Sequence, residues 1–146
     1  MMQITEPDSN SDNENKAPYG VEAASFQAAG GIEGIRRLVD EFYDQMCTLD
    51  EAKNIRSMHA DDLSESREKL AFFLSGWLGG PKLYREKYGP IRIPAAHGHL
   101  EIGTLERDAW LLCMKKALDM QPYQNDFKKY LLQELFVPAE RSRNKD

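Results

Sequence analysis

Apolar residues recur at three- and four-residue steps along most of the chain, and this period indicates amphipathic α-helices. The clearest such stripe consists of Ile32, Ile35, Leu38, Val39, Phe42 and Met46. Tyr43 lies at one edge of the stripe. A shorter helix is predicted before it, beginning near Pro18 and ended by Gly30 and Gly31, because glycine readily adopts the conformation that ends a helix. No segment alternates apolar and polar residues as a strand does, so the pattern predicts an all-α domain.

Three more helices are predicted in the second half of the chain. An irregular segment over residues 50–61 precedes the first of them. That helix is expected to begin at Asp62, with Glu65 completing a capping-box-like start, and to end at a glycine pair. Thr104 is the expected N-cap of the next helix. The last helix is expected to end before Pro138, because proline interrupts the hydrogen bonds of a helix.

The segment between Gly79 and Trp110 is long for a connection between two helices, since irregular loops rarely exceed about 15 residues in a compact domain. It contains two of the chain's three histidines, His97 and His99, among apolar residues. A neutral imidazole in an apolar wall suits the iron of a haem as its protein ligand. The segment therefore predicts a bound haem. A solvated His-x-His loop that binds a metal ion weakly is the alternative.

Trp110 and Tyr43 could donate hydrogen bonds to a ligand as well as pack in the core. Each, taken alone, is most often a core aromatic residue, but an indole N–H and a phenol O–H both need a partner when they are buried. If the two helices face one another, both groups could point at one bound diatomic ligand. The spacing permits this arrangement without requiring it.

Composition narrows the class of protein. The 146 residues suffice for one domain, and 19 basic against 24 acidic residues give a net charge of −5. No basic patch carries interleaved aromatic residues, so no nucleic-acid partner is expected. No apolar run is long enough to span a membrane and no signal peptide is visible, so a cytoplasmic protein is expected. Cys47 and Cys113 lack the spacing of a metal site and are expected to be buried free thiols.

Three blocks of sequence together resemble a known family. They are GGIEGIRRLVDEFYDQM, DLSESREKLAFFLSGWLGGPKLYREKYG and the stretch from His97 to Trp110, which continues into ERDAWLLCM. In this order they resemble the second of the three groups of truncated haemoglobins, over roughly residues 18–136. The resemblance implies an all-α fold, a globin-like two-over-two helical sandwich around a haem.

The two ends of the chain lie outside the expected truncated globin domain of residues 18–137. Residues 1–17 are polar, acidic and nearly devoid of apolar side chains, so they bury too little surface to offset the entropy of ordering. They are expected to form a disordered N-terminal extension, and residues 138–146 a charged C-terminal tail.

The resemblance also assigns roles to individual residues. His97 matches the ligand of the haem iron, because it stands thirteen residues before Trp110 as the family's ligand does. The distal pocket, where a ligand binds on the other side of the haem, matches Tyr43, His59, Ser66, Leu70 and Trp110. The other residues implied to bind the haem are Lys69, Phe73, Tyr84 and Arg92. Of these, Lys69, Tyr84 and Arg92 match positions that contact the haem propionates.

Three positions depart from the family pattern. Ala96 stands where the family often has an arginine before the iron ligand, which removes one contact to a propionate. Gly98 and His99 replace the usual leucine and proline, and the glycine loosens the local helix. His59 replaces a phenylalanine or tyrosine, which adds a second possible ligand or hydrogen-bond donor on the distal side.

These assignments imply a protein that binds dioxygen and other diatomic molecules at the iron of a haem b. Trp110 and Tyr43 are the principal hydrogen-bond donors, and His59 is a third if its ring turns inward. One alternative is a haem redox enzyme that removes nitric oxide, reactive nitrogen species or peroxide with an unidentified reductase. Another is a ligand or redox sensor in which Tyr43 or His59 ligates the iron. The sequence leaves open whether the protein is an enzyme, and whether it is a monomer or a homodimer.

Overall fold

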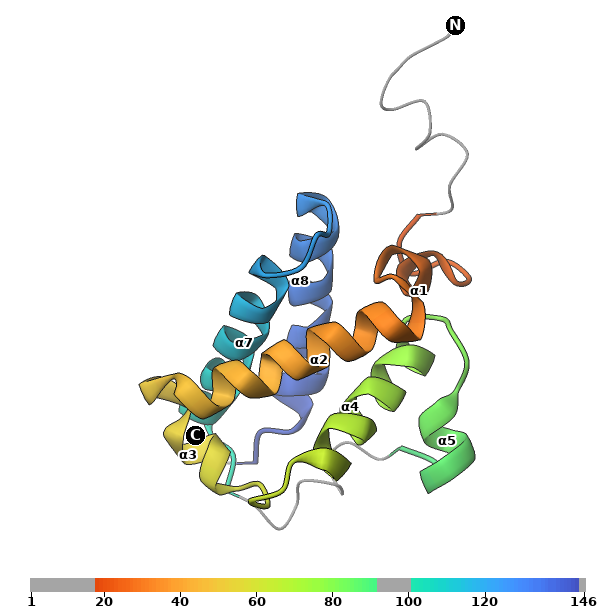
Figure 1. Ribbon diagram of the computed structural model, residues 1–146. Coiled ribbons are helices and arrows are strands. Elements are labelled where there is room, and N and C mark those ends of the chain that lie inside the picture. Colours follow the sequence, from red (N-terminus) through yellow and green to blue (C-terminus); the bar gives the residue numbers. More distant parts are fainter. Residues whose placement is uncertain (1–17, 92–100, 145–146) are drawn as a thin grey trace, which may run out of the picture.

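The computed structural model of the protein describes residues 18–91 and 101–144. Every regular element within these two ranges is a helix (Figure 1). In chain order the elements are α1 (Ala24–Ala28), α2 (Gly31–Thr48), the 3₁₀ helix η3 (Asp50–Ala52), α3 (Lys53–Ser57), α4 (Ser64–Trp77), α5 (Leu83–Tyr88), α7 (Thr104–Asp119) and α8 (Asn125–Arg141). The all-α prediction is confirmed. None of the helices in the described ranges is long and apolar enough to cross a membrane.

Helix α2 is the element on which the others pack. Figure 1 shows it crossing α7, with α4 below it in this view, and α2 contacts both of these helices. Helix α7 packs in turn on α8, and α4 on α5. In the described parts of the chain, α4 makes no comparable contact with α7 or α8. Helices α2 and α4 thus form one packed pair and α7 and α8 another, and the two pairs meet where α2 packs on α7.

The core lies where the apolar stripe of α2 meets the other long helices. The predicted stripe is confirmed, because Ile35, Leu38, Val39, Phe42 and Met46 are all buried. Their partners in the core cluster from the other long helices include Leu74, Met114, Leu118, Phe127, Leu131 and Leu135. Burial of such side chains is worth about 1.5–3 kcal/mol each relative to exposure. The periodic pattern thus identified the buried face of α2 correctly.

The short elements η3, α3 and α5 were not predicted, whereas the predicted short helix before Gly30 is present as α1, which begins at Ala24 and not near Pro18. Residues 50–61, expected to be irregular, contain η3 and α3, and the expected loop after Gly79 contains α5. A helix of three to six residues has too few turns for its apolar residues to repeat, so the periodic pattern does not reveal it. Packing holds η3 and α3 in place, since Ala52 and Ile55 are buried in the core.

The starts of two helices also differ from the prediction. The capping box expected at Asp62 is wrong, because α4 begins at Ser64 and Asp62 instead accepts a hydrogen bond from the Ser64 N–H at 2.9 Å. Thr104 is not an N-cap, since Gly103 occupies that position in α7. The Gly103 N–H donates to the Glu106 carboxylate at 2.7 Å, so a side chain of the first turn satisfies this backbone donor at the start of α7.

Helix α8 continues through Pro138 to Arg141, so the prediction that it ends before Pro138 is wrong. Proline removes one hydrogen bond of the helix, but contacts outside the helix hold its last turn. The Glu140 carboxylate pairs with Arg107 of α7 at 2.8 Å. Beyond the helix, the Asn144 N–H donates to the Ile102 carbonyl at 2.7 Å, and the Asn144 side chain accepts from the Ile102 N–H at 2.8 Å.

One of the two cysteines is placed differently from the prediction. Cys113 is buried on α7, and burial raises the pKa of its thiol to about 11. Cys47 is exposed, so its predicted burial is wrong. It follows the buried Met46 near the end of α2, and consecutive residues of a helix point in different directions, so Cys47 lies outside the buried face.

Gly34 is the position on α2 where an added methyl group should be most costly. A Cβ there would lie 1.9 Å from the carbonyl oxygen of Ala29, so the two segments could not stay in contact. We expect Gly34→Ala to lower the free energy of unfolding by about 2–3 kcal/mol, as overpacking does. Urea denaturation followed by circular dichroism measures this. Gly76→Ala is the control, because its Cβ would approach Lys82 only to 3.3 Å, and it should change stability by less than about 1 kcal/mol. Equal stabilities of the two variants would contradict the prediction.

Candidate haem site

Four aromatic rings from three parts of the chain are linked in a row. The ring of His59, which follows α3, meets the ring of Tyr43 edge-on with centroids 5.7 Å apart. Tyr43 meets Phe42 of α2 at 4.9 Å, and Phe42 meets Trp110 of α7 at 5.0 Å. The structure therefore brings three predicted distal residues together, with the fully buried Phe42 between Tyr43 and Trp110.

Tyr43 is almost completely buried, with 5% of its surface exposed. Its O–H donates to the backbone carbonyl of Ser66 on α4 at 3.4 Å. That distance is beyond the usual range for such bonds, so the bond is weak and the hydroxyl hydrogen can turn to a better acceptor. Burial raises the pKa of Tyr43 far above its ordinary value, and the positive charge of Arg67 opposes this only in part. Tyr43 therefore remains a protonated donor at neutral pH.

The hydrogen bond of His59 fixes its tautomer. Its Nδ1 lies 2.8 Å from the carbonyl oxygen of Ile55. A carbonyl oxygen only accepts hydrogen bonds, so Nδ1 carries the hydrogen and, in the neutral ring, Nε2 carries the lone pair. His59 is half-buried, and its ring lies against that of Tyr43.

Trp110 is half-buried on the second turn of α7. Its indole N–H has no hydrogen-bond partner among the residues that the structure describes. Such a group only donates, so it favours an acceptor that is not supplied by these residues. The other two predicted distal residues, Ser66 and Leu70, lie half-buried on α4, and Leu70 packs at the edge of the core.

Two of the residues predicted to contact the haem propionates converge on a third side chain. The ammonium of Lys69 lies 5.1 Å from the ring centroid of Tyr88, and the ring of Tyr84 lies 5.1 Å from that of Tyr88. Lys69 also pairs with Glu65 at 3.0 Å. The sequence analysis did not select Tyr88. Its place one helical turn after Tyr84 would have indicated it, had α5 been predicted.

Phe73, the remaining described residue of the predicted haem set, is half-buried on α4 and stacks on Trp77 at 6.1 Å. His97 and Arg92 lie outside the described residues, and so do Ala96 and His99. Their assignment therefore stays a prediction. Within the described ranges, no three His, Cys, Asp or Glu side chains are arranged to hold a metal ion.

The described residues fit a haem. Helices α4 and α7 both pack on α2 without comparable contact to each other, and each carries apolar side chains that the core covers only in part. Leu70, Phe73 and Trp110 are these side chains. Lys69 of α4 and Tyr84 of α5, which meet at Tyr88, supply a cation and a hydroxyl. A flat apolar group with carboxylates at one edge, such as a haem, would cover the apolar side chains, and its carboxylates would pair with Lys69 and Tyr84.

A hollow lies between the segment before α1, the end of α4 and α8. Its volume is about 280 Å³, and it is lined by residues that include Glu22, Trp77, Tyr130 and Glu134. None of the residues predicted to bind haem or its ligand lines it. It is therefore separate from the candidate site.

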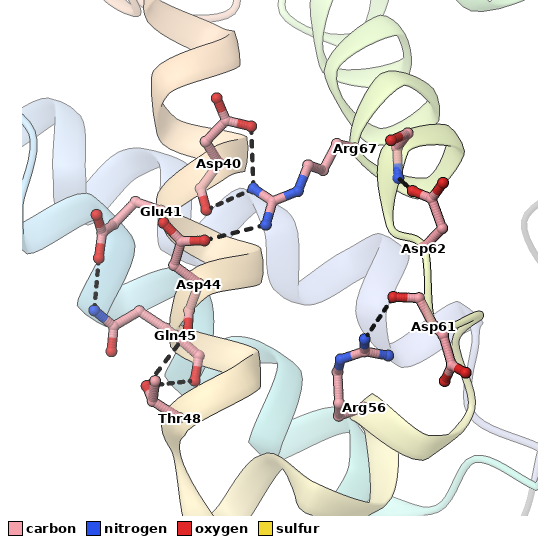
Figure 2. Close-up of polar contacts among 10 residues, drawn as sticks. Asp40, Glu41, Asp44, Gln45, Thr48, Arg56, Asp61, Asp62 and Arg67 are labelled. Carbon is pink, nitrogen blue, oxygen red and sulfur yellow. Dashed lines mark hydrogen bonds and ion pairs between the residues drawn. The ribbon is translucent and has the colours of Figure 1, made fainter.

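Arg67, like Tyr88, was not selected by the sequence analysis. Arg67 of α4 bonds to Asp40 and Asp44 of α2 beside Tyr43 (Figure 2). The signal was present in part, since two aspartates one helical turn apart form an acidic strip on α2. Nothing in the sequence alone indicates that an arginine from another helix lies against them.

Helices α2 and α4 pack as one pair on the pair α7 and α8, and the aromatic row joins α2 to α7, which defines the class of the protein as a two-over-two globin. The family model of the bacterial-like globins matches residues 24–139. The chain therefore belongs to the bacterial-like globin family, and within it to the group II truncated haemoglobins.

Individual relatives agree with this assignment. The group 2 truncated haemoglobin YjbI of Bacillus subtilis (strain 168) is 35% identical over 123 residues, which cover 82% of this chain and 91% of that protein. The group II 2-on-2 haemoglobin of the plant pathogen Agrobacterium tumefaciens superposes with a TM-score of 0.79 at 35% identity, over 84% of this chain and 95% of that chain. A truncated haemoglobin of Bacillus subtilis described as oxygen-avid superposes with a TM-score of 0.76 at 32% identity, over 82% of this chain and 98% of that chain.

A carboxylate at Leu70 should impair haem uptake. The substitution Leu70→Asp places a charge among half-buried apolar side chains, where it is costly. We expect haem affinity to fall at least about tenfold, equivalent to about 1.4 kcal/mol. Titration of the haem-free protein with haemin, followed by tryptophan fluorescence, measures this. Leu105→Asp is the control because Leu105 is 79% exposed, and its affinity should equal that of the wild type. Equal affinities for both variants would show that Leu70 does not line the haem site.

Proposed function

We propose that the protein binds dioxygen, and other diatomic molecules, at a haem b whose iron takes His97 as its protein ligand. Membership of the group II truncated haemoglobins supports a haem. The oxygen-avid character given to the Bacillus subtilis relative supports dioxygen as the ligand. The haem supplies an iron that binds diatomic molecules, and the chain's own residues set how tightly these are held.

The observation that carries the proposal is the indole N–H of Trp110. It is a donor with no hydrogen-bond partner among the described residues, on a half-buried ring that packs on Phe42 in the aromatic row. Dioxygen gains negative charge when it binds to ferrous iron, so a donor aimed at it stabilises the complex and slows its release. The weakly bonded hydroxyl of Tyr43 is the second donor. His59 becomes a third when its imidazole is protonated.

The remaining residues of the proposed site have supporting roles. Leu70 keeps the ligand side dry, which strengthens the hydrogen bonds made there. Ser66 is small and leaves a more open route past α4 than a bulky residue would. Lys69, Tyr84 and Arg92 are proposed to hold the haem propionates, and Phe73 packs on the haem.

Replacement of the two neighbouring histidines should separate their roles. We expect wild-type protein loaded with haem to show a strong Soret band. His97→Ala should lose the spectrum of a histidine-ligated iron, whereas His99→Ala should retain it, because only His97 is proposed to ligate the iron. Ferric, ferrous and oxygenated absorption spectra measure this. If His99→Ala were the variant that lost ligation, the assignment of the iron ligand would be wrong.

Removal of the indole donor should speed ligand release. We expect Trp110→Phe to raise the rate of dioxygen dissociation about tenfold, because one lost hydrogen bond of about 1.4 kcal/mol corresponds to that factor. Stopped-flow replacement of dioxygen by carbon monoxide measures the rate. Trp77→Phe is the matched control, since Trp77 is 36% exposed and stacks outside the aromatic row. An unchanged rate in Trp110→Phe would refute the donor role.

The same measurements bear on the alternatives to simple binding. Sustained consumption of nitric oxide or peroxide by the haem-loaded protein with a reductant would make it an enzyme. A low-spin spectrum without added ligand would indicate that a distal side chain ligates the iron, and Tyr43→Phe and His59→Phe would identify which one.

A further inference from the structure

A cluster of three charged side chains joins α4 to α2 beside the proposed ligand site. The Nη1 atom of Arg67 donates to the carbonyl oxygen of Asp40 at 3.0 Å and to its carboxylate at 3.1 Å. The Nη2 atom donates to the carboxylate of Asp44 at 3.1 Å. Figure 2 shows the guanidinium of Arg67 reaching from α4 to both aspartates on α2. Three acceptors thus fix the orientation of one planar group.

The same guanidinium covers the side chain of Tyr43. Its central carbon lies 5.7 Å from the centroid of the Tyr43 ring, within the range of a cation–π contact. Asp40 and Asp44 stand one helical turn apart on α2, on the same side of Tyr43 around the helix axis. They hold the arginine over the ring.

Ser66, the residue before Arg67, contacts the hydroxyl of the same tyrosine. The backbone carbonyl of Ser66 accepts the hydrogen bond from the Tyr43 hydroxyl at 3.4 Å. One turn of α4 therefore contacts both the ring face and the hydroxyl of Tyr43. A shift of this turn relative to α2 would move the hydroxyl and uncover the ring together.

The contribution of the cluster is orientation more than stability. The side chains of Asp40 and Asp44 are 61% and 63% exposed, and ion pairs this exposed to solvent contribute little net stability. Arg67 is 29% exposed, so its guanidinium is the better shielded partner. Its fork geometry restricts where α4 can lie against α2 even when the net free energy is small.

A second arginine provides an internal comparison. Arg36 of α2 lies 5.5 Å from the ring centroid of Phe72 on α4, so it also joins the two helices by a cation–π contact. It is exposed and makes no ring contact with Tyr43. Removal of Arg36 therefore tests for a general loosening of the two helices without a direct effect on the tyrosine.

We propose that Arg67 is a positioning residue that holds Tyr43 in the orientation in which its hydroxyl serves a bound diatomic ligand, and so sets the rate at which that ligand leaves. This inference rests on the proposed function. Arg67 itself does not touch the ligand in this proposal. It acts through the ring of Tyr43 and through the turn of α4 that carries Ser66.

A double-mutant cycle on the haem-loaded protein tests the inference. We expect Arg67→Met, which keeps length but removes charge and hydrogen bonds, to raise the dioxygen dissociation rate roughly three- to tenfold. In a Tyr43→Phe background the same substitution should leave the rate unchanged, because the group it positions is gone. Arg36→Met should leave the rate unchanged in both backgrounds. An equal effect of Arg67→Met in both backgrounds, no effect at all, or an equal effect of Arg36→Met would overturn the inference.

A second measurement reads the tyrosine directly and does not depend on dioxygen binding. With ¹³C-labelled tyrosine in the haem-loaded protein, we expect the ring resonance of Tyr43, assigned by its loss in Tyr43→Phe, to shift in Arg67→Met and not in Arg36→Met. An unshifted Tyr43 resonance in Arg67→Met overturns the positioning role. If the resonance shifts but wild-type protein binds no dioxygen, the proposed function fails while the positioning of Tyr43 by Arg67 stands.

Discussion

The buried face of α2 is the contact on which the rest of the structure depends. Phe42 is fully buried at the middle of this face, and its ring touches both Tyr43 and Trp110. Because α4 and α7 both pack on α2 and make no comparable contact with each other in the described residues, the position of α2 decides the distance between them. The same helix thus closes the core and sets the width of the candidate site.

The core and the candidate haem site are continuous. Leu70, Phe73 and Trp110 pack against fully buried residues on one side and are only half-buried on the other. Such apolar surface gains about 25 cal/mol per Å² when it is removed from water. A haem between α4 and α7 would complete the burial of these side chains, so binding of the cofactor and stability of the fold are expected to be coupled.

Charged clusters orient the helices at two places away from the apolar core. Arg67 fixes α4 against α2 beside Tyr43, and Glu140 fixes the end of α8 against α7. Hydrogen bonds from Arg143 and Arg107 hold the pKa of Glu140 down at about 2, so this carboxylate stays charged through the physiological range. Both clusters are partly exposed, and their main effect is on which geometry the packed helices adopt.

The sequence by itself determined the long helices, because each has enough turns for its apolar residues to repeat, as in α2. It also determined the family, through the order and spacing of its motifs, and the resemblance led to the prediction that Tyr43, His59 and Trp110 lie near one ligand. The tertiary structure alone decided the short helices α3 and α5, the passage of α8 through Pro138, and the row of rings centred on Phe42. It alone placed Arg67 over Tyr43. These features depend on contacts between residues far apart in the chain. A local pattern does not indicate which distant side chain will supply a hydrogen bond or a cation–π contact.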